Sequence, residues 1–270
     1  MPRANVGEIH LDYEVHGAGT PLILIMGASG TSAWWGPLVP LLARAFRVVV
    51  FDNRGIGLSD GADAPYSTLT MAGDTAGLMD ILGIDAAHIL GFSMGGLVAQ
   101  ELALRWPQRV LSLILAGTGD GAGTISDEIR ALSRQAASLP FAAVLPMMPA
   151  MLFSQEYIQD HPEAVEAFKA AALARPVSSA VRLRQLDAIE AHRTRDRLAA
   201  ITAPTLVLGG EKDVLVPIEH QREFAARIAG AEFAVLAGCG HLFTTQAPDA
   251  TSRVLLDFLA RHPGSAARPS

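Results

Sequence analysis

Residues 88–96 constrain the fold more than any other segment, because an apolar run there ends in a glycine-rich turn. The segment reads His-Ile-Leu-Gly-Phe-Ser-Met-Gly-Gly, which predicts a buried strand followed at once by a helix over residues 94–106. A serine at such a turn has a strained backbone and tolerates only small neighbours, which the glycines provide. The turn places Ser93 at a helix N-terminus, where backbone N–H groups and the helix dipole favour negative charge. Ser93 is therefore a candidate nucleophile, and the alternative interpretation is a glycine-rich helix start capped by serine.

Two later turns carry the groups that a reactive serine requires. A hydrolytic serine needs a base that takes its proton and an acid that holds this base in one tautomer. Asp213 lies in a turn between a predicted strand and a predicted helix, and His241 lies in the turn after the next predicted strand. Functional groups of an open α/β sheet gather at the carboxyl ends of its strands. We therefore expect Ser93, Asp213 and His241, in this chain order, to form a catalytic triad.

Other polar side chains compete for these roles. Asp120 follows the strand predicted at 110–116 and is the alternative acid, because a triad acid can also come from that neighbouring strand end. The clear strand before Asp213 and the helix after it favour Asp213. Asp52 and Arg54 lie in a glycine-rich loop, and we expect them to stabilise that turn by hydrogen bonds and an ion pair.

Predicted strands and helices alternate along most of the chain, which predicts an α/β fold with a mostly parallel sheet. The predicted strands are 8–15, 21–26, 46–51, the run that ends at Leu90, 110–116, 205–209 and 232–236. The predicted helices are 69–82, 94–106, one that begins near Pro217 and one that runs from the turn of His241 to about Arg261.

These segments together resemble an α/β-hydrolase-fold enzyme of the small esterase, enol-lactonase and cofactor-free haloperoxidase group. Besides the triad segments, residues 48–59 read Val-Val-Val-Phe-Asp-Asn-Arg-Gly-Ile-Gly-Leu-Ser, similar to the Asp-x-Arg-Gly-x-Gly-x-Ser loop of that family. Residues 22–30, followed by Trp34, occupy the place of its oxyanion loop. The resemblance spans nearly the whole chain and implies a sheet of the eight-stranded α/β-hydrolase type flanked by helices, with a helical cap inserted after the sixth strand.

The resemblance also implies an oxyanion hole. Met26 stands where the family usually has a histidine before Gly27, but the donor itself is a backbone N–H, so the hole can survive this change. The expected donors are the N–H groups of Met94 and Ala28, with that of Gly27 as the alternative.

Residues 119–198 interrupt the alternation of strands and helices. They read as short helices broken by several prolines, and so long an insertion between neighbouring strands is too much for a plain loop. We expect a helical cap over the active site. The expected division is a hydrolase core at 1–118 and 199–262, a cap at 119–198 and a disordered tail at 263–270.

An apolar, methionine-rich cluster in the cap is expected mainly to pack the cap onto the core. Some of its members should line the acyl or alcohol pocket, since methionine adapts to irregular apolar ligands. The candidate pocket residues in the cap are Met147, Met148, Met151 and Phe153, and those in the core are Trp34, Phe92, Val214 and Leu215.

Composition narrows the class of protein. Hydrophobic residues make up 50% of the chain and charged residues 18%, enough apolar material for a sheet buried on both faces. The net charge of −6 and the lack of a basic run argue against a nucleic-acid partner. No leader-like or membrane-spanning apolar stretch is evident, so we expect a cytoplasmic protein without a membrane partner. The histidines lack metal-ligand spacing, so neither a metal nor another cofactor is expected, and the lone Cys239 should be a packed residue.

The sequence therefore predicts a serine hydrolase that cleaves a small to medium hydrophobic ester or lactone through an acyl-enzyme. Carbon–carbon bond hydrolysis and perhydrolysis or haloperoxidase activity use the same triad and stay as alternatives. The first would require a basic anchor for a dienol-type acid, and Arg175, Arg182 and Arg184 are the candidates in the cap. A small-molecule receptor or signalling protein with a retained triad is an alternative of another class. Monomer and homodimer are both compatible with the sequence.

Overall fold

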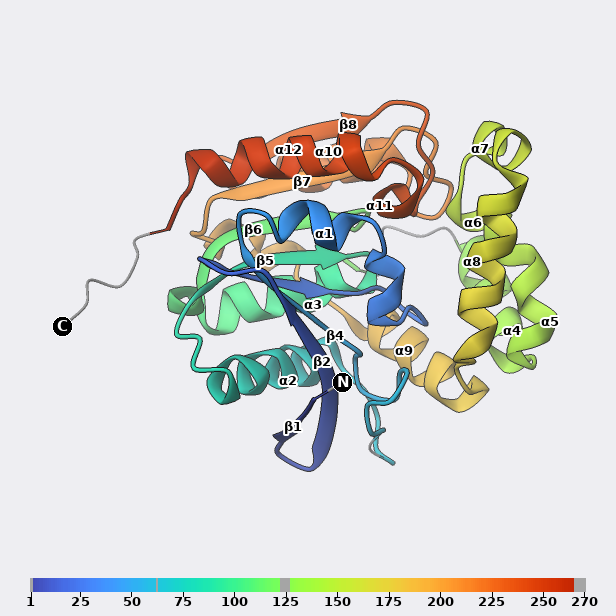
Figure 1. Cartoon of the computed structure of the whole chain (residues 1–270), viewed down its shortest axis with the longest axis horizontal. Helices are drawn as coiled ribbons and strands as arrows, with labels where there is room; N and C mark the ends of the chain where they lie inside the picture. The colour runs from blue at the N-terminus through green and yellow to red at the C-terminus, as the bar shows by residue number, and fades with distance from the viewer. Residues whose placement is uncertain (1, 62, 122–126, 265–270) are drawn as a thin grey trace.

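The computed structural model of the 270-residue chain describes residues 2–61, 63–121 and 127–264, and its centre is a twisted eight-stranded sheet (Figure 1). The strand order is β1-β2-β4-β3-β5-β6-β7-β8. The strands are β1 (Arg3–Val6), β2 (Ile9–His16), β3 (Pro21–Ile25), β4 (Arg47–Phe51), β5 (Ala87–Phe92), β6 (Val110–Ala116), β7 (Thr205–Gly210) and β8 (Glu232–Leu236). Neighbours from β4 to β8 pair in parallel, whereas β1 and β2 are antiparallel to their neighbours. The mostly parallel eight-stranded sheet expected from the sequence is thus confirmed.

Continuous burial explains why the central strands lack alternating polarity. Every residue of β5 and of β7 is buried, and β3 and β6 each have one partly exposed residue. A strand that is covered on both faces needs apolar side chains at every position. The sequence of β6, Val-Leu-Ser-Leu-Ile-Leu-Ala, meets this requirement except at its serine.

Helices cover both faces of the sheet and create two hydrophobic cores. On one face lie α2 (Thr68–Ile81) and α3 (Met94–Arg105), which pack side by side, and α10 (Ile218–Ala225). On the other face α1 (Leu38–Leu42) packs against α12 (Pro248–Arg261), with the short α11 (Phe243–Gln246) beside them. The single helix predicted from the turn of His241 to Arg261 is wrong in this detail, because it divides into two helices at Ala247 and Pro248.

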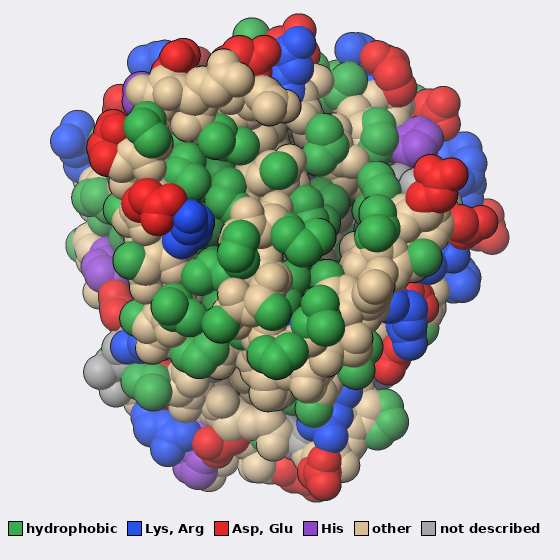
Figure 2. All heavy atoms as spheres, turned by 90° about the vertical axis from the view of Figure 1, so that its right-hand side faces the viewer, with side chains coloured by type: hydrophobic (Ala, Val, Ile, Leu, Met, Phe, Trp, Pro, Cys, Tyr) green, Lys and Arg blue, Asp and Glu red, His purple; other side chains and the backbone are tan. Residues whose placement is uncertain are grey.

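The chain between β6 and β7 forms a helical insertion. Its helices are α4 (Asp127–Ser138), α5 (Phe141–Val144), η3 (Leu145–Met147), α6 (Met148–Leu152), α7 (Gln155–Asp160), α8 (Pro162–Ala174), α9 (Ser179–Ala191) and η4 (Arg195–Ala200). Figure 1 shows α4 to α8 grouped at one end of the sheet. Figure 2 views the molecule from this end and shows hydrophobic side chains spread across its centre, with charged ones mainly at the margins. The tail predicted at 263–270 lies outside the described residues from residue 265 onward.

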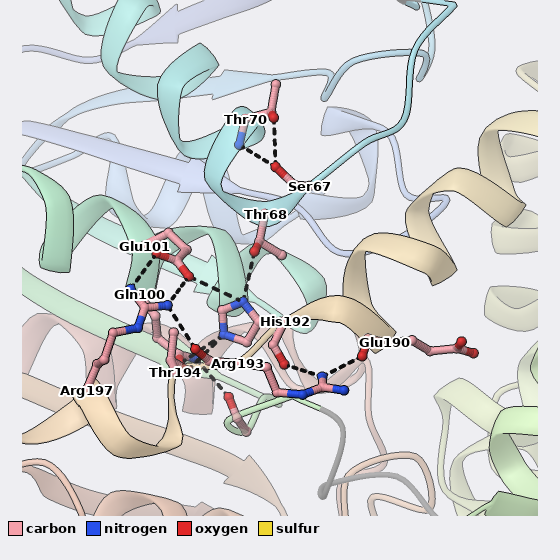
Figure 3. Close-up of polar contacts among 11 residues, drawn as sticks. Ser67, Thr68, Thr70, Gln100, Glu101, Glu190, His192, Arg193, Thr194 and Arg197 are labelled. Carbon is pink, nitrogen blue, oxygen red and sulfur yellow. Dashed lines mark hydrogen bonds and ion pairs between the residues drawn. The ribbon is translucent and has the colours of Figure 1, made fainter.

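A buried polar cluster joins the ends of the insertion to the core (Figure 3). His192, which follows α9, is 2% exposed and its Nδ1 lies 2.8 Å from the Thr68 hydroxyl at the start of α2. Its Nε2 lies 2.8 Å from the hydroxyl of Thr194, which donates to Oε1 of Gln100 on α3 at 2.5 Å. Gln100 in turn donates from Nε2 to the carbonyl oxygen of Gly119 at 2.7 Å. A neutral imidazole that donates from Nε2 and accepts at Nδ1 satisfies this whole chain of hydrogen bonds.

We expect the cluster to make the protein less stable in mild acid. Burial lowers the pKa of His192 to about 4, whereas the unfolded chain takes up this proton near its ordinary pKa of about 6.5. The unfolded state therefore binds more protons between these values, and the free energy of unfolding falls as the pH falls through this window. For His192 alone the loss between pH 7 and pH 5 is about 2 kcal/mol, and the buried His88, whose pKa burial also lowers to about 4, adds to it.

Urea unfolding at pH 7 and pH 5 measures this effect. The His192→Gln variant should lose the part of the pH dependence that His192 supplies, and His161→Gln, at an exposed histidine, should retain all of it. An identical pH dependence in wild type and His192→Gln would contradict the assignment.

Candidate active site

Ser93 lies in the turn that connects β5 to α3, and its backbone is in the left-handed region. Its φ is 53° and its ψ is −121°, and Ser29 is the one other non-glycine with positive φ among the described residues. Such a conformation costs about 1–3 kcal/mol and is found mainly at functional sites. The neighbouring glycine is needed for space, since a Cβ at Gly95 would lie 2.0 Å from the carbonyl oxygen of Ile25.

Asp213 and His241 are buried and hydrogen-bonded to each other. Asp213 follows β7 and His241 follows β8, and Nδ1 of His241 lies 2.7 Å from Oδ2 of Asp213. The other carboxylate oxygen accepts the backbone N–H groups of Leu215 and Val216, both at 2.9 Å. Gln221 also donates to Oδ2, at 3.3 Å. A carboxylate held in this way accepts the Nδ1–H of the imidazole and leaves Nε2 unprotonated, as a general base requires.

The other polar side chains considered in the sequence analysis, Asp120, Asp52 and Arg54, form ion pairs or hydrogen bonds with residues other than His241. Asp120 pairs with Arg195, with 3.5 Å between Oδ2 and the guanidinium, so the structure brings Asp213 and not Asp120 to His241. Asp52 and Arg54 do not pair with each other as expected for their loop. Arg54 forms a buried bidentate pair with Asp74 of α2, at 2.7 and 2.6 Å, and Asp52 accepts the backbone N–H of Ser32 at 2.7 Å.

Ser93 and His241 both line a cavity of about 210 Å³. Of the pocket residues expected from the sequence, five line it: Trp34, Phe92, Met148, Met151 and Leu215. Three do not. Met147 and Val214 are 51% and 53% exposed, and Phe153 packs edge to face against Phe168 inside the insertion.

Two helices of the insertion supply lining residues that the sequence analysis missed. They are Ile129, Ser133, Ala136 and Ala137 of α4 and Arg182, Leu186 and Ile189 of α9. Each set recurs at helical spacing, so each occupies one face of its helix. In α4 this periodicity is a signal that the sequence carries, whereas the sequence of α9 has no amphipathic pattern from which its inward face could be predicted.

The loop after β3 offers backbone donors next to Ser93. Gly27 and Ala28 line the cavity, and a Cβ at Gly27 would lie 2.9 Å from Cβ of Ser93. The N–H groups of the next two residues are already used: Ser29 donates to Oε1 of Gln185 at 2.9 Å, and Gly30 donates to the carbonyl oxygen of Gly27 at 3.3 Å. Met94 is the first residue of α3, where N–H groups have no partner within the helix.

The other reactive groups of the described residues form no second candidate site. Cys239 is buried, and burial together with the charge of Glu211 raises the pKa of its thiol, which keeps it protonated and unreactive. Within residues 2–61, 63–121 and 127–264, no three His, Cys, Asp or Glu side chains come together in a way that could hold a metal ion. No helix in that part of the chain is both long and apolar enough to cross a membrane.

Comparison with known proteins identifies the family. Residues 20–248 match the sequence model of the alpha/beta hydrolase fold. The chain belongs to this family. It is 32% identical to the RutD protein of Azorhizobium caulinodans, named as a carbamate hydrolase, over 96% of this chain and 98% of that protein.

Solved structures of the same family superpose closely. The enol-lactonase of Burkholderia xenovorans LB400 has a TM-score of 0.88 and 28% sequence identity, with coverage of 96% of this chain and 100% of that one. A thermophilic esterase of Thermogutta terrifontis has a TM-score of 0.87 and 30% identity, with coverage of 97% and 100%. Membership of this family and the names of these relatives support a hydrolase activity for this chain.

Proposed function

We propose that this α/β-hydrolase cleaves small to medium hydrophobic carboxylic esters or lactones with the triad Ser93, Asp213 and His241. One observation carries the proposal: a serine in a strained turn and a histidine fixed by a buried carboxylate lie in the wall of the same cavity. A nucleophile, its base and the group that orients the base are the minimum set for acyl transfer.

The proposed chemistry proceeds through an acyl-enzyme. Nε2 of His241 takes the proton of the Ser93 hydroxyl while Oγ attacks the substrate carbonyl, and the N–H groups of Met94 and Ala28, or of Gly27, stabilise the oxyanion. The imidazolium then gives this proton to the leaving alkoxide, and the carbon–oxygen bond breaks. A water molecule deprotonated by His241 then attacks the acyl carbon. The imidazolium returns this proton to Oγ of Ser93 as the acyl–oxygen bond breaks, and the acid leaves.

The substrate class is supported by the cavity and by the relatives. Most lining side chains are aliphatic or aromatic, as in sites for apolar ligands. Two similar structures are an enol-lactonase and an esterase. We also propose that residues 119–198 act as a cap on the core formed by 1–118 and 199–262, because α4, α5, α6 and α9 all supply residues that line the cavity.

Turnover of a series of p-nitrophenyl esters and lactones tests the proposal. We expect many turnovers per protein molecule, with a preference for medium over long acyl chains. Stoichiometric binding without release of acid would identify a receptor and contradict the proposal.

The methionines of the insertion give a prediction about selectivity. Met148 and Met151 line the cavity, so Met148→Ala and Met151→Ala should redistribute kcat/KM among ester chain lengths by about 1–3 kcal/mol, the scale of apolar pocket discrimination. Met147→Ala is the matched control because Met147 is exposed, and its chain-length profile should equal that of wild type. Equal losses on all esters together with a lowered Tm in the first two variants would show that these methionines only pack the insertion.

A further inference from the structure

Arg182 of α9 is a buried cation in the wall of an otherwise apolar cavity. It is 6% exposed, and Leu186 and Ile189 line the cavity from the same face of the helix. Long cationic side chains are almost never this buried without a partner of opposite charge.

The hydrogen bonds of Arg182 leave part of its guanidinium unused. One terminal nitrogen donates to the carbonyl oxygen of Leu139, and the other lies 3.5 Å from that of Ala136. Its charged group also lies over the ring of Phe141, 5.6 Å from the centroid. Nε is buried and has no hydrogen-bond partner.

No carboxylate of the described residues forms an ion pair with Arg182, in contrast to the other buried arginine. Arg54 is 7% exposed and holds Asp74 in a bidentate pair. The other arginines of α4 and α9 also have acidic partners, as Arg134 has in Asp187 and Arg184 has in Asp63. The carbonyl oxygens at the end of α4 offset part of the charge of Arg182, but burial still lowers its pKa.

We infer that Arg182 is a substrate-binding residue that receives a free carboxylate from Nε–H and an adjacent N–H. A planar guanidinium edge with two donors fits a carboxylate, and a single cation in an apolar wall fits a single negative charge. The inference rests on the proposed hydrolysis at Ser93 and names its substrates as half-esters of dicarboxylic acids or lactones that carry a carboxylate. The scissile carbonyl would lie at Ser93 and the carboxylate at Arg182.

The experiment compares charged and neutral esters of matched length. p-Nitrophenyl half-esters of glutaric, adipic and pimelic acid are each paired with the neutral ester of the same chain length. For wild type we expect kcat/KM of at least one half-ester to exceed that of its neutral partner. In Arg182→Met this ratio should fall by about 10- to 100-fold, mainly through KM, because a hydrogen bond to a charged group is lost.

Two further variants separate binding from packing. Arg182→Lys keeps the charge but not the planar pair of donors, so its ratio should lie between those of wild type and Arg182→Met. Arg184→Met removes a cation from the same helix, one that pairs with Asp63 at the surface, and its ratio should equal that of wild type. Loss of packing alone would change the rates of both esters and leave their ratio as it was.

The outcomes distinguish this inference from the proposed function. Hydrolysis of all esters with the same ratio in wild type and Arg182→Met would overturn the carboxylate site and leave ester hydrolysis standing. A folded wild type that hydrolyses none of the esters would overturn the proposed function. In that case calorimetric binding of monomethyl adipate to wild type and to Arg182→Met tests the carboxylate contact without turnover, and equal affinities would overturn it.

Discussion

Replacing Ser93 by alanine is expected to lower kcat for an aryl ester by about 10³-fold or more while the protein stays folded. The substitution removes the nucleophilic oxygen and nothing else of the turn. Alanine keeps the Cβ, so the left-handed backbone at this position, with φ of 53°, is as strained as before. The melting temperature of Ser93→Ala should therefore lie close to that of wild type.

Ser29→Ala is the matched control for this experiment. Ser29 also has a positive φ, of 63°, and lines the same cavity, but we assign its hydroxyl no part in proton transfer. Its variant should keep kcat within tenfold of wild type, and a fluorophosphonate probe should label wild type once, at Ser93. More than a tenth of wild-type activity in Ser93→Ala, or labelling at another serine, would remove Ser93 from its role.

The second large effect is expected at Asp213, the acid of the proposed triad. In Asp213→Asn the amide oxygen can still accept the N–H groups of Leu215 and Val216, which now bond to one carboxylate oxygen. The amide NH₂ then faces Nδ1 of His241 and donates to it. The imidazole must carry its proton on Nε2 instead, where it cannot accept the proton of Ser93, and kcat should fall by about 10⁴-fold.

Asp120→Asn provides the comparison, because Asp120 is also buried after a strand but pairs with Arg195. Its kcat should change by a few-fold at most. Steady-state measurement of kcat for both variants at one pH distinguishes the two candidate acids. A larger loss in Asp120→Asn than in Asp213→Asn would show that the acid comes from the other strand end.

The parts of the fold that follow from local sequence were predictable. The segment that became β6 was predicted with the observed ends because it is a continuous apolar run between polar turns. β1 was missed because Arg-Ala-Asn-Val has neither length nor alternation, and its pairing with β2 stabilises it. The break between α11 and α12 was missed although Pro248 marks it, because proline disrupts the interior of a helix and is favoured at the first position, where it begins α12.

The candidate site likewise has parts that could be predicted from the sequence and parts that could not. The turns that carry Asp213 and His241 could be predicted because each follows a strand, and strand ends in a parallel sheet converge. Apart from the face of α4, the cavity wall could not be predicted, because α5 and α6 are too short to show a periodic pattern and α9 is not amphipathic. Met147 and Met148 are adjacent in sequence, yet Met147 points to solvent and Met148 to the cavity. The burial of Arg182 likewise depends on how α9 packs against α4, which no local pattern encodes.

The two ends of the helical insertion are neighbours, and this has a consequence for how enzymes of this kind can diversify. Gly121 near the start of the insertion pairs with Arg193 near its end through an isolated antiparallel bridge. The buried polar cluster around His192 holds this end of the insertion against α3. A segment whose ends already meet can grow, shrink or be replaced at a small cost in loop-closure entropy. Substrate range can therefore evolve by exchange of this module, while the strand ends that position Ser93, Asp213 and His241 keep their spacing.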